Sequence, residues 1–225
     1  MKYYLFLSFC FIALLTGCAK SKSEDIRTTG LYVQYHATAA ENRGSVSASV
    51  TIQVGGPTGT YVDLSGSDKI FCNGQEMDRS NLFNMITYTK TLPYQSHGLY
   101  EFVLKREGEA DKTARVTLPD VVDISQPQNM EASRIGDPLF VRWNRGSDKT
   151  VIDLTKSNDG GADFHSTQDP DIGELTIPGS QTLAKTPGVA TLRVSRIRAG
   201  EFPAGFTGGH IHGKESRSIS VNLVP

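Results

Sequence analysis

Two histidines near the C-terminal end of the sequence have the residue type and the spacing that metal binding requires. The stretch Gly208-Gly209-His210-Ile211-His212-Gly213 separates them by one residue. On an extended strand, side chains two positions apart share a face, and two imidazoles can begin a zinc, copper or nickel site. A third ligand is needed, and His165 or His97 supplies it only if the fold brings one of them close.

The glycines around this pair favour a different outcome. Positions 205, 208, 209 and 213 are all glycine, which is typical of a mobile loop between strands. Ordering such a loop costs about 1–2 kcal/mol per residue fixed, and two neutral imidazoles have no identified third ligand to help offset that cost. We therefore expect His210 and His212 to face solvent and assign no metal and no cofactor, with an exported metal-handling protein or enzyme around this pair as the alternative.

A second set of possible ligands is acidic and lies in a glycine-rich stretch between residues 158 and 174. Its aspartates are Asp159, Asp163, Asp169 and Asp171. Calcium prefers oxygen ligands of this kind, but the spacing is not that of an EF-hand, because no glycine follows alternating acids and no glutamate closes the loop. We interpret the stretch as a solvated loop, in which Asp171-Ile172-Gly173 forms a tight turn before a strand.

The motifs that place a catalytic nucleophile or a catalytic zinc are absent. The sequence has no Gly-x-Ser-x-Gly, no Ser-x-x-Lys and no His-Glu-x-x-His. The glycine-rich run at 55–60 lacks the lysine that would contact a phosphate, so it favours a turn between strands. We therefore expect a protein that is not an enzyme.

The N-terminal residues indicate export. Lys2 precedes an apolar run from Tyr3 to Leu15, and Leu15-Thr16-Gly17-Cys18 follows. A basic start, a short apolar segment and a small-residue cleavage site are typical of a signal peptide, here residues 1–17. The apolar run is shorter than the roughly 20 residues that a membrane-spanning helix needs.

The tetrad ending at Cys18 resembles the lipobox of bacterial lipoproteins. The resemblance implies cleavage before Cys18 and acylation of that cysteine, as in other palmitate-bearing lipoproteins, and two or more acyl chains hold a protein stably on a membrane. The residue after the cysteine is Ala19 and not an aspartate, which resembles the outer-membrane sorting pattern of lipoproteins in a Gram-negative host. The resemblance implies a lipoprotein of the outer membrane that faces the periplasm or the cell surface. Residues 18–29 are polar, so we expect them to form a lipidated tether.

Charge and cysteine content exclude some functions. The chain of 225 residues has 23 basic and 24 acidic residues, so electrostatics favour no nucleic-acid partner. Once Cys18 is acylated, Cys72 is the only free thiol of the mature chain, and it lies at the end of an apolar strand without a basic neighbour. We expect a buried, unreactive thiol there.

The remaining sequence predicts strands rather than helices. Apolar residues alternate with polar ones over 31–37, 45–54 and 100–104, which is typical of half-buried antiparallel strands. Asn73-Gly74 after an apolar run predicts a type I′ hairpin. Residues 78–85 could form one short helical turn.

A new pattern begins near residue 120. A proline-led stretch at 127–132 precedes Leu139, Val141 and Trp143, which alternate with Phe140 and Arg142. This order resembles the opening of a fibronectin type III domain, and the resemblance, which covers about residues 120–225, implies an immunoglobulin-like sandwich with Trp143 in its core. The tyrosine that the family usually has before its sixth strand is missing, since residues 183–192 contain none.

These observations predict an all-β fold with two antiparallel immunoglobulin-like β-sandwich domains, at residues 30–119 and 120–225. We expect a lipid-anchored, non-catalytic binding or structural protein of the bacterial cell envelope. Its predicted partners are the membrane, through the anchor, and an envelope protein or glycan, because sandwich domains present edges and loops for such contacts.

Overall fold

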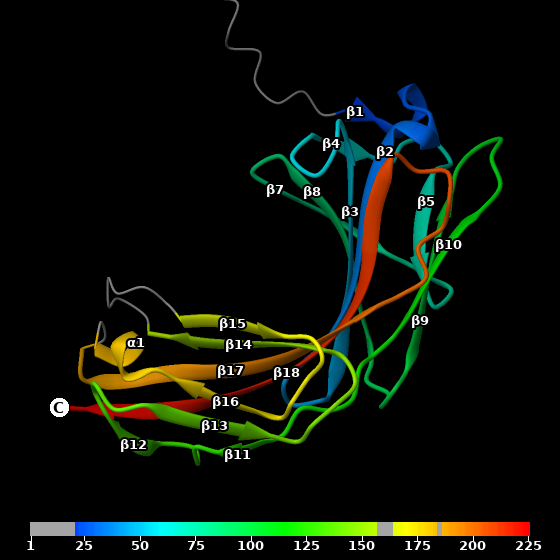
Figure 1. Cartoon of the computed structure of the whole chain (residues 1–225). Coiled ribbons are helices and arrows are strands. Elements are labelled where there is room, and N and C mark those ends of the chain that lie inside the picture. Colours follow the sequence, from blue (N-terminus) through cyan, green and yellow to red (C-terminus); the bar gives the residue numbers. More distant parts are fainter. Residues whose placement is uncertain (1–20, 157–163, 184–185) are drawn as a thin grey trace, which may run out of the picture.

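The computed structural model describes residues 21–156, 164–183 and 186–225, and over these residues the chain is all-β, as the sequence predicts. The helical parts of the described chain are α1 (Gly179–Leu183) and 3-10 turns at Ser23–Asp25 and Thr28–Gly30. The described strands form three sheets (Figure 1), and the side chains between these sheets form two hydrophobic cores. The predicted signal peptide and Cys18 lie outside the described residues.

The first core lies between part of the largest sheet and a four-stranded sheet. The largest sheet contributes β1 (Ser21–Lys22), β4 (Thr60–Asp63), β3 (Ser45–Val54), β2 (Leu31–Ala39), the start of β18 (Gly208–Val224), β8 (Met85–Pro93) and β7 (Asp78–Leu82). The opposing sheet has the order β10 (Lys112–Thr117), β9 (Leu99–Lys105), β5 (Lys69–Cys72), β6 (Gln75–Glu76). The predicted alternation is confirmed, since every second residue of β2 from Leu31 to Ala39 is buried.

The second core lies between the remainder of the largest sheet and a three-stranded sheet. The largest sheet continues from the end of β18 in the order β17 (Gly188–Ala199), β14 (Lys149–Thr155), β15 (Phe164–Gln168), and β12 (Glu131–Arg134) pairs with β18 on its other side. The opposing sheet has the order β11 (Ile124–Gln126), β13 (Leu139–Trp143), β16 (Glu174–Ile177). Leu139, Val141 and Trp143 are buried while Arg142 is exposed. The core position predicted for Trp143 is confirmed.

One strand belongs to both cores. The first part of β18, Gly208–Lys214, pairs in parallel with β2, and His212–Leu223 pairs antiparallel with β17. Ile211 is buried in the first core, whereas Val221 and Leu223 are buried in the second. The largest sheet therefore runs without a break from one core to the other (Figure 1), and the division into independent domains at 30–119 and 120–225 stays a prediction.

The predicted tether is wrong for residues 21–29, because they pack on the first sandwich. Ser23 and Thr28 are buried, and β1 pairs in parallel with β4. The guanidinium of Arg106 donates a hydrogen bond to the Ile26 carbonyl and another to Thr28 Oγ1, each 2.7 Å long, and it forms an ion pair with Asp68. A polar segment packs here because the guanidinium of a buried arginine donates hydrogen bonds to its carbonyl and hydroxyl oxygens, which composition alone does not reveal.

Two turn predictions have opposite outcomes. Asn73 and Gly74 have φ of 46° and 75° and close the β5–β6 hairpin, so that prediction is confirmed. The helical turn predicted over 78–85 is wrong, since these residues form β7, the turn and the start of β8. The first four residues of β7, Asp78–Asn81, are polar, so the first turn of a helix here would have had no apolar side chain to bury.

Candidate functional site

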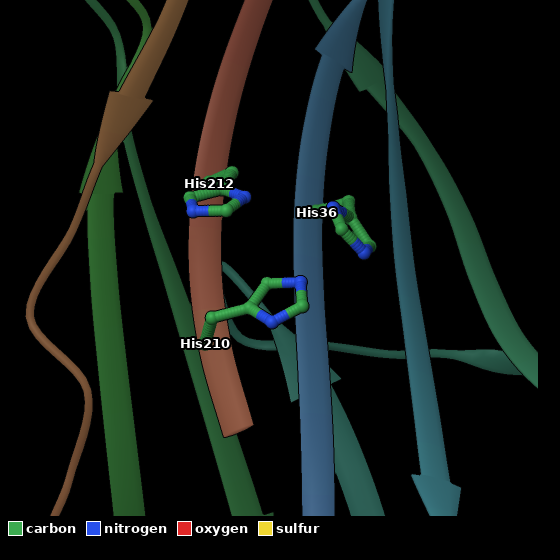
Figure 2. Close-up of side chains that lie close together, drawn as sticks. All are labelled: His36, His210 and His212. Atoms are coloured by element: carbon green, nitrogen blue, oxygen red, sulfur yellow. The ribbon is translucent and has the colours of Figure 1, made fainter. Parts of the chain in front are cut away.

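Three histidines gather on the outer face of the first sandwich, at the seam between β2 and β18. The parallel register sets His212 opposite His36 and His210 opposite Gln34. Because strand residues two apart share a face, all three rings stand on the same side of the sheet, as Figure 2 shows. We call His36, His210 and His212 the three-histidine cluster.

The rings of the cluster are close enough to share one ion. One ligand nitrogen from each ring lies within 4.8 Å of the others. His210 and His212 stack with ring centroids 4.6 Å apart, and the His36 ring stands edge-on to His210 at 5.2 Å. In a tetrahedral zinc site with Zn–N bonds of about 2.0–2.1 Å, ligand nitrogens are about 3.3 Å apart, so metal binding requires the rings to rotate inward by a small amount.

The environment keeps these imidazoles uncharged. All three side chains are half-buried. Burial, reinforced by the neighbouring His210, His212 and Lys214, lowers the pKa of His36 to about 4. Burial also lowers the pKa of His210 and of His212, the latter with smaller contributions from His210 and Lys149. At neutral pH each ring therefore has a free lone pair, the form that binds a metal.

The glycines that predicted a mobile loop serve a different purpose. A Cβ at position 209 would lie 2.0 Å from the Val33 carbonyl oxygen, and one at position 213 would lie 2.6 Å from the Thr117 carbonyl oxygen. Glycine thus lets β18 pass close to its neighbours, and Gly208–Val224 is one continuous strand. The mobile-loop prediction is wrong, and His210 and His212 are half-buried residues of a paired strand, on the outer face of the sheet.

The third histidine is not one of the two considered from the sequence. His165 Nδ1 lies 2.7 Å from Asp153 in the second sandwich, and His97 Nδ1 lies 3.5 Å from Asp120. His36 occupies that place instead. The available signal was its position on the polar face of a predicted strand, but its parallel pairing with a strand more than 170 residues away has no local signature.

The structure also places part of the acidic stretch. Asp159 and Asp163 lie outside the described residues, and Asp169 is exposed. Asp171 is fully buried and starts the turn that leads through Gly173, with φ of 81°, into β16. That turn is the predicted one. Asp171 is not a solvated loop residue, however, and within the described residues it belongs to no group of possible metal ligands.

Asp171 is the centre of a buried polar network. Its Oδ1 accepts hydrogen bonds from Trp143 Nε1 at 2.9 Å and from the Gly173 amide at 2.8 Å. Its Oδ2 accepts from the Gly146 amide and from Nε and Nη2 of Arg196, which is also fully buried. Burial alone would raise the pKa of Asp171, but these hydrogen bonds outweigh it and hold the pKa below its usual value.

Cys72 is in the environment that the sequence predicts. The thiol is free and buried, and burial raises its pKa to about 12. It therefore stays protonated at neutral pH and is a packing residue of the first core.

Comparison with known proteins adds a general likeness. No family model matches the sequence, and no curated protein matches it. Among solved structures, the fibronectin(III)-like modules of Clostridium thermocellum CbhA align over 86% of this chain and 93% of theirs at 9% identity, with a TM-score of 0.28. The IG1 and IG2 domains of DIP-gamma align over 87% of this chain and 98% of theirs, at 7% identity and a TM-score of 0.25.

A glycan-associated protein gives a similar result. SGBP-B of the Bacteroides ovatus mixed-linkage glucan utilization locus aligns over 91% of this chain and 65% of its own at 11% identity, with a TM-score of 0.25. Scores this low carry no function from these proteins to this chain. Separately, none of the helices in the described residues has the length and apolar character to cross a membrane.

Proposed function

We propose that this protein is a lipid-anchored binding protein of the bacterial cell envelope and that it binds a divalent transition metal ion with His36, His210 and His212. The observation that carries this proposal is the convergence of three neutral imidazoles, from two paired strands, on one side of a sheet. It replaces our expectation of no metal, because both premises of that expectation, a mobile loop and the lack of an identified third ligand, differ from the structure.

The rigidity of the backbone lowers the cost of binding. β2 is hydrogen-bonded to β3 along its whole length and to β18 through seven residue pairs. A metal ion therefore fixes three side chains but no loop, and the ordering cost is confined to rotamers, which cost less than backbone. In this respect the site is preorganised.

The donor set selects the kind of ion. Three imidazole nitrogens suit zinc, copper(II) or nickel(II), whereas calcium and magnesium require oxygen ligands. Three protein ligands leave a fourth position open in a tetrahedral site. An open position lets the ion exchange with an external ligand, as a protein that captures an ion and passes it on requires.

The envelope location rests on the sequence. The lipobox-like tetrad ending at Cys18 supports acylation, and the apolar segment before it supports export. The outer-membrane assignment, and an envelope protein or glycan as a further partner, stay predictions.

Calorimetric titration of the tag-free mature protein in detergent with zinc tests the metal proposal. We expect one site with a submicromolar Kd, and a loss of affinity of about 100-fold or more, equivalent to about 2.7 kcal/mol, for His36→Ala. His165→Ala is the matched control, since it removes an exposed histidine from the second sandwich. A His36→Ala protein that binds zinc as tightly as the wild type contradicts the proposal.

A further inference from the structure

The turn between β7 and β8 exposes apolar side chains that the fold does not use. Phe83 is 88% exposed, and Leu82 and Met85 beside it are 59% and 45% exposed. Leu82 pairs with Met85, so Phe83 and Asn84 are the two turn residues. We call Leu82, Phe83 and Met85 the apolar tip.

The backbone conformation of this turn is unfavourable for a phenylalanine at position 83. Phe83 and Asn84 have φ of 48° and 65°, the left-handed region that a type I′ turn requires at both positions. Asparagine and glycine adopt it easily, whereas a bulky aromatic residue does so at a cost. Asn73-Gly74 shows what this chain uses where only a turn is needed. An exposed phenylalanine in this position stabilises neither the turn nor the core.

The apolar tip points toward the end of the sandwich at which the chain enters the fold. β8 runs beside β3 only as far as Tyr88, opposite Val50, and β4 then takes the place beside Gln53–Val54. The β7–β8 hairpin therefore leaves the sheet. β7 runs in the same direction as β3, toward the end where β1 pairs with β4 (Figure 1).

Contacts tie the hairpin to the N-terminal strand. Lys22 of β1 is opposite Asp63 of β4, and Asp63 accepts hydrogen bonds from Arg79 of β7, each 2.6 Å long. Cys18 is three residues before Ser21, a reach of about 10 Å. The tip is about four residues beyond Arg79, or about 13 Å along an extended strand. Ser21, the first described residue after Cys18, and the apolar tip therefore lie at the same end of the first sandwich.

We propose that the apolar tip inserts into the surface of the lipid bilayer that holds the anchor. This inference rests on the lipid anchoring of the proposed function and not on metal binding. Aromatic and aliphatic side chains on a turn enter the headgroup boundary readily, and their apolar area adds to the binding that acyl chains provide. The second contact would fix the orientation of the protein on the membrane, which a flexible lipid anchor alone does not.

Site-specific fluorescence on the full, acylated protein tests the proposal. Phe83→Cys is labelled with an environment-sensitive dye and reconstituted into vesicles of phosphatidylethanolamine and phosphatidylglycerol. The buried Cys72 and the acylated Cys18 do not compete for the label. Phe140→Cys is the matched control, because Phe140 is 62% exposed but lies in the second sandwich. We expect a blue shift and quenching by brominated lipids at position 83 and neither at position 140.

Three other results would overturn the proposal. One is a dye at position 83 that stays as solvated and as unquenched as the dye at position 140, although the protein floats with the vesicles. A second is shielding at position 83 in native membrane fragments but not in pure lipid vesicles, which would identify a protein partner. The third is an acylation-competent protein that fails to float with vesicles at all, which removes the anchor on which the tip proposal depends but leaves the zinc titration unaffected.

Discussion

The Asp171–Arg196 network and the three-histidine cluster are both groups of titratable side chains, yet they differ in how their polar atoms are paired. The Asp171 carboxylate accepts hydrogen bonds from Trp143 of β13, from the Gly146 amide in the loop after it, and from the buried guanidinium of Arg196 on β17. The cluster's rings make no hydrogen bond to any other residue in the described part of the chain, and each has mainly the other two rings as polar neighbours.

This difference separates a structural role from a ligand-binding role. In a fully paired buried network every hydrogen-bonding group already has a partner, so replacing one of its residues affects folding. Three unpaired imidazoles contribute little to folding, and their lone pairs remain available to a ligand. The predictions below test this separation by asking whether stability and metal binding can be changed independently.

The largest effect on stability is expected from Asp171→Ala. The substitution leaves the buried Arg196 guanidinium without its carboxylate and the Trp143 indole N–H without an acceptor. Breaking a buried ion pair in this way costs about 3–5 kcal/mol. Urea denaturation monitored by circular dichroism measures the loss. A change below 1 kcal/mol would show that the pair behaves like a surface salt bridge.

A smaller loss is expected from Trp143→Phe. Phenylalanine keeps most of the buried apolar volume but removes the hydrogen bond to Asp171, a change worth about 1–3 kcal/mol because the acceptor is charged. Denaturant unfolding compares the variant with the wild type. In the wild type, Trp143 is the only tryptophan and should emit at a buried wavelength, so emission at the fully solvated wavelength would refute its core position.

Glu215 lies on β18, three residues after His212 and opposite Arg196 of β17, and its contribution to stability should depend on pH. It is 2% exposed, its Oε1 has no hydrogen-bond partner among the described residues, and burial raises its pKa. A raised carboxyl pKa means that stability present below pH 4.5 is lost as pH rises through the folded-state value. We therefore expect Glu215→Gln to be more stable than the wild type at pH 8, by about 1 kcal/mol, and no more stable at pH 4. Thermal melts at the two pH values test this, and an equal offset at both would contradict it.

The smallest effect without metal is expected from His36→Gln. The substitution should change stability at pH 8 by no more than about 0.5 kcal/mol, as at ordinary partly exposed positions. Because the pKa of His36 is lowered to about 4, the wild type is fully stabilised above pH 6.5 and loses that contribution as pH falls toward 4, whereas the glutamine variant does not. Melts across this range, with and without zinc, measure both effects. Zinc at 100 times its Kd should stabilise only the wild type, by about 2.7 kcal/mol.

Local sequence patterns predicted most of the strands but only part of the site. Alternation in Leu31–Ala39 and Leu139–Trp143 depends on neighbours in sequence, so it can be read directly. The glycines before His212 could not be interpreted in this way, because glycine serves close strand packing and loop flexibility equally well. His36 joins the cluster only through the parallel pairing of β2 with β18, which depends on the path of the whole chain. The packing of residues 21–29 has no local signature for the same reason, since Arg106 is far from them in sequence.

The most direct test of the central claim is a crystal of the mature protein grown with zinc and measured on both sides of the zinc absorption edge. We predict a single strong anomalous peak about 2.0–2.1 Å from one nitrogen of each ring of His36, His210 and His212, and no such peak at His165 or Asp171. An empty cluster at saturating zinc, or a peak that contacts only His210 and His212, would contradict the proposed three-histidine site.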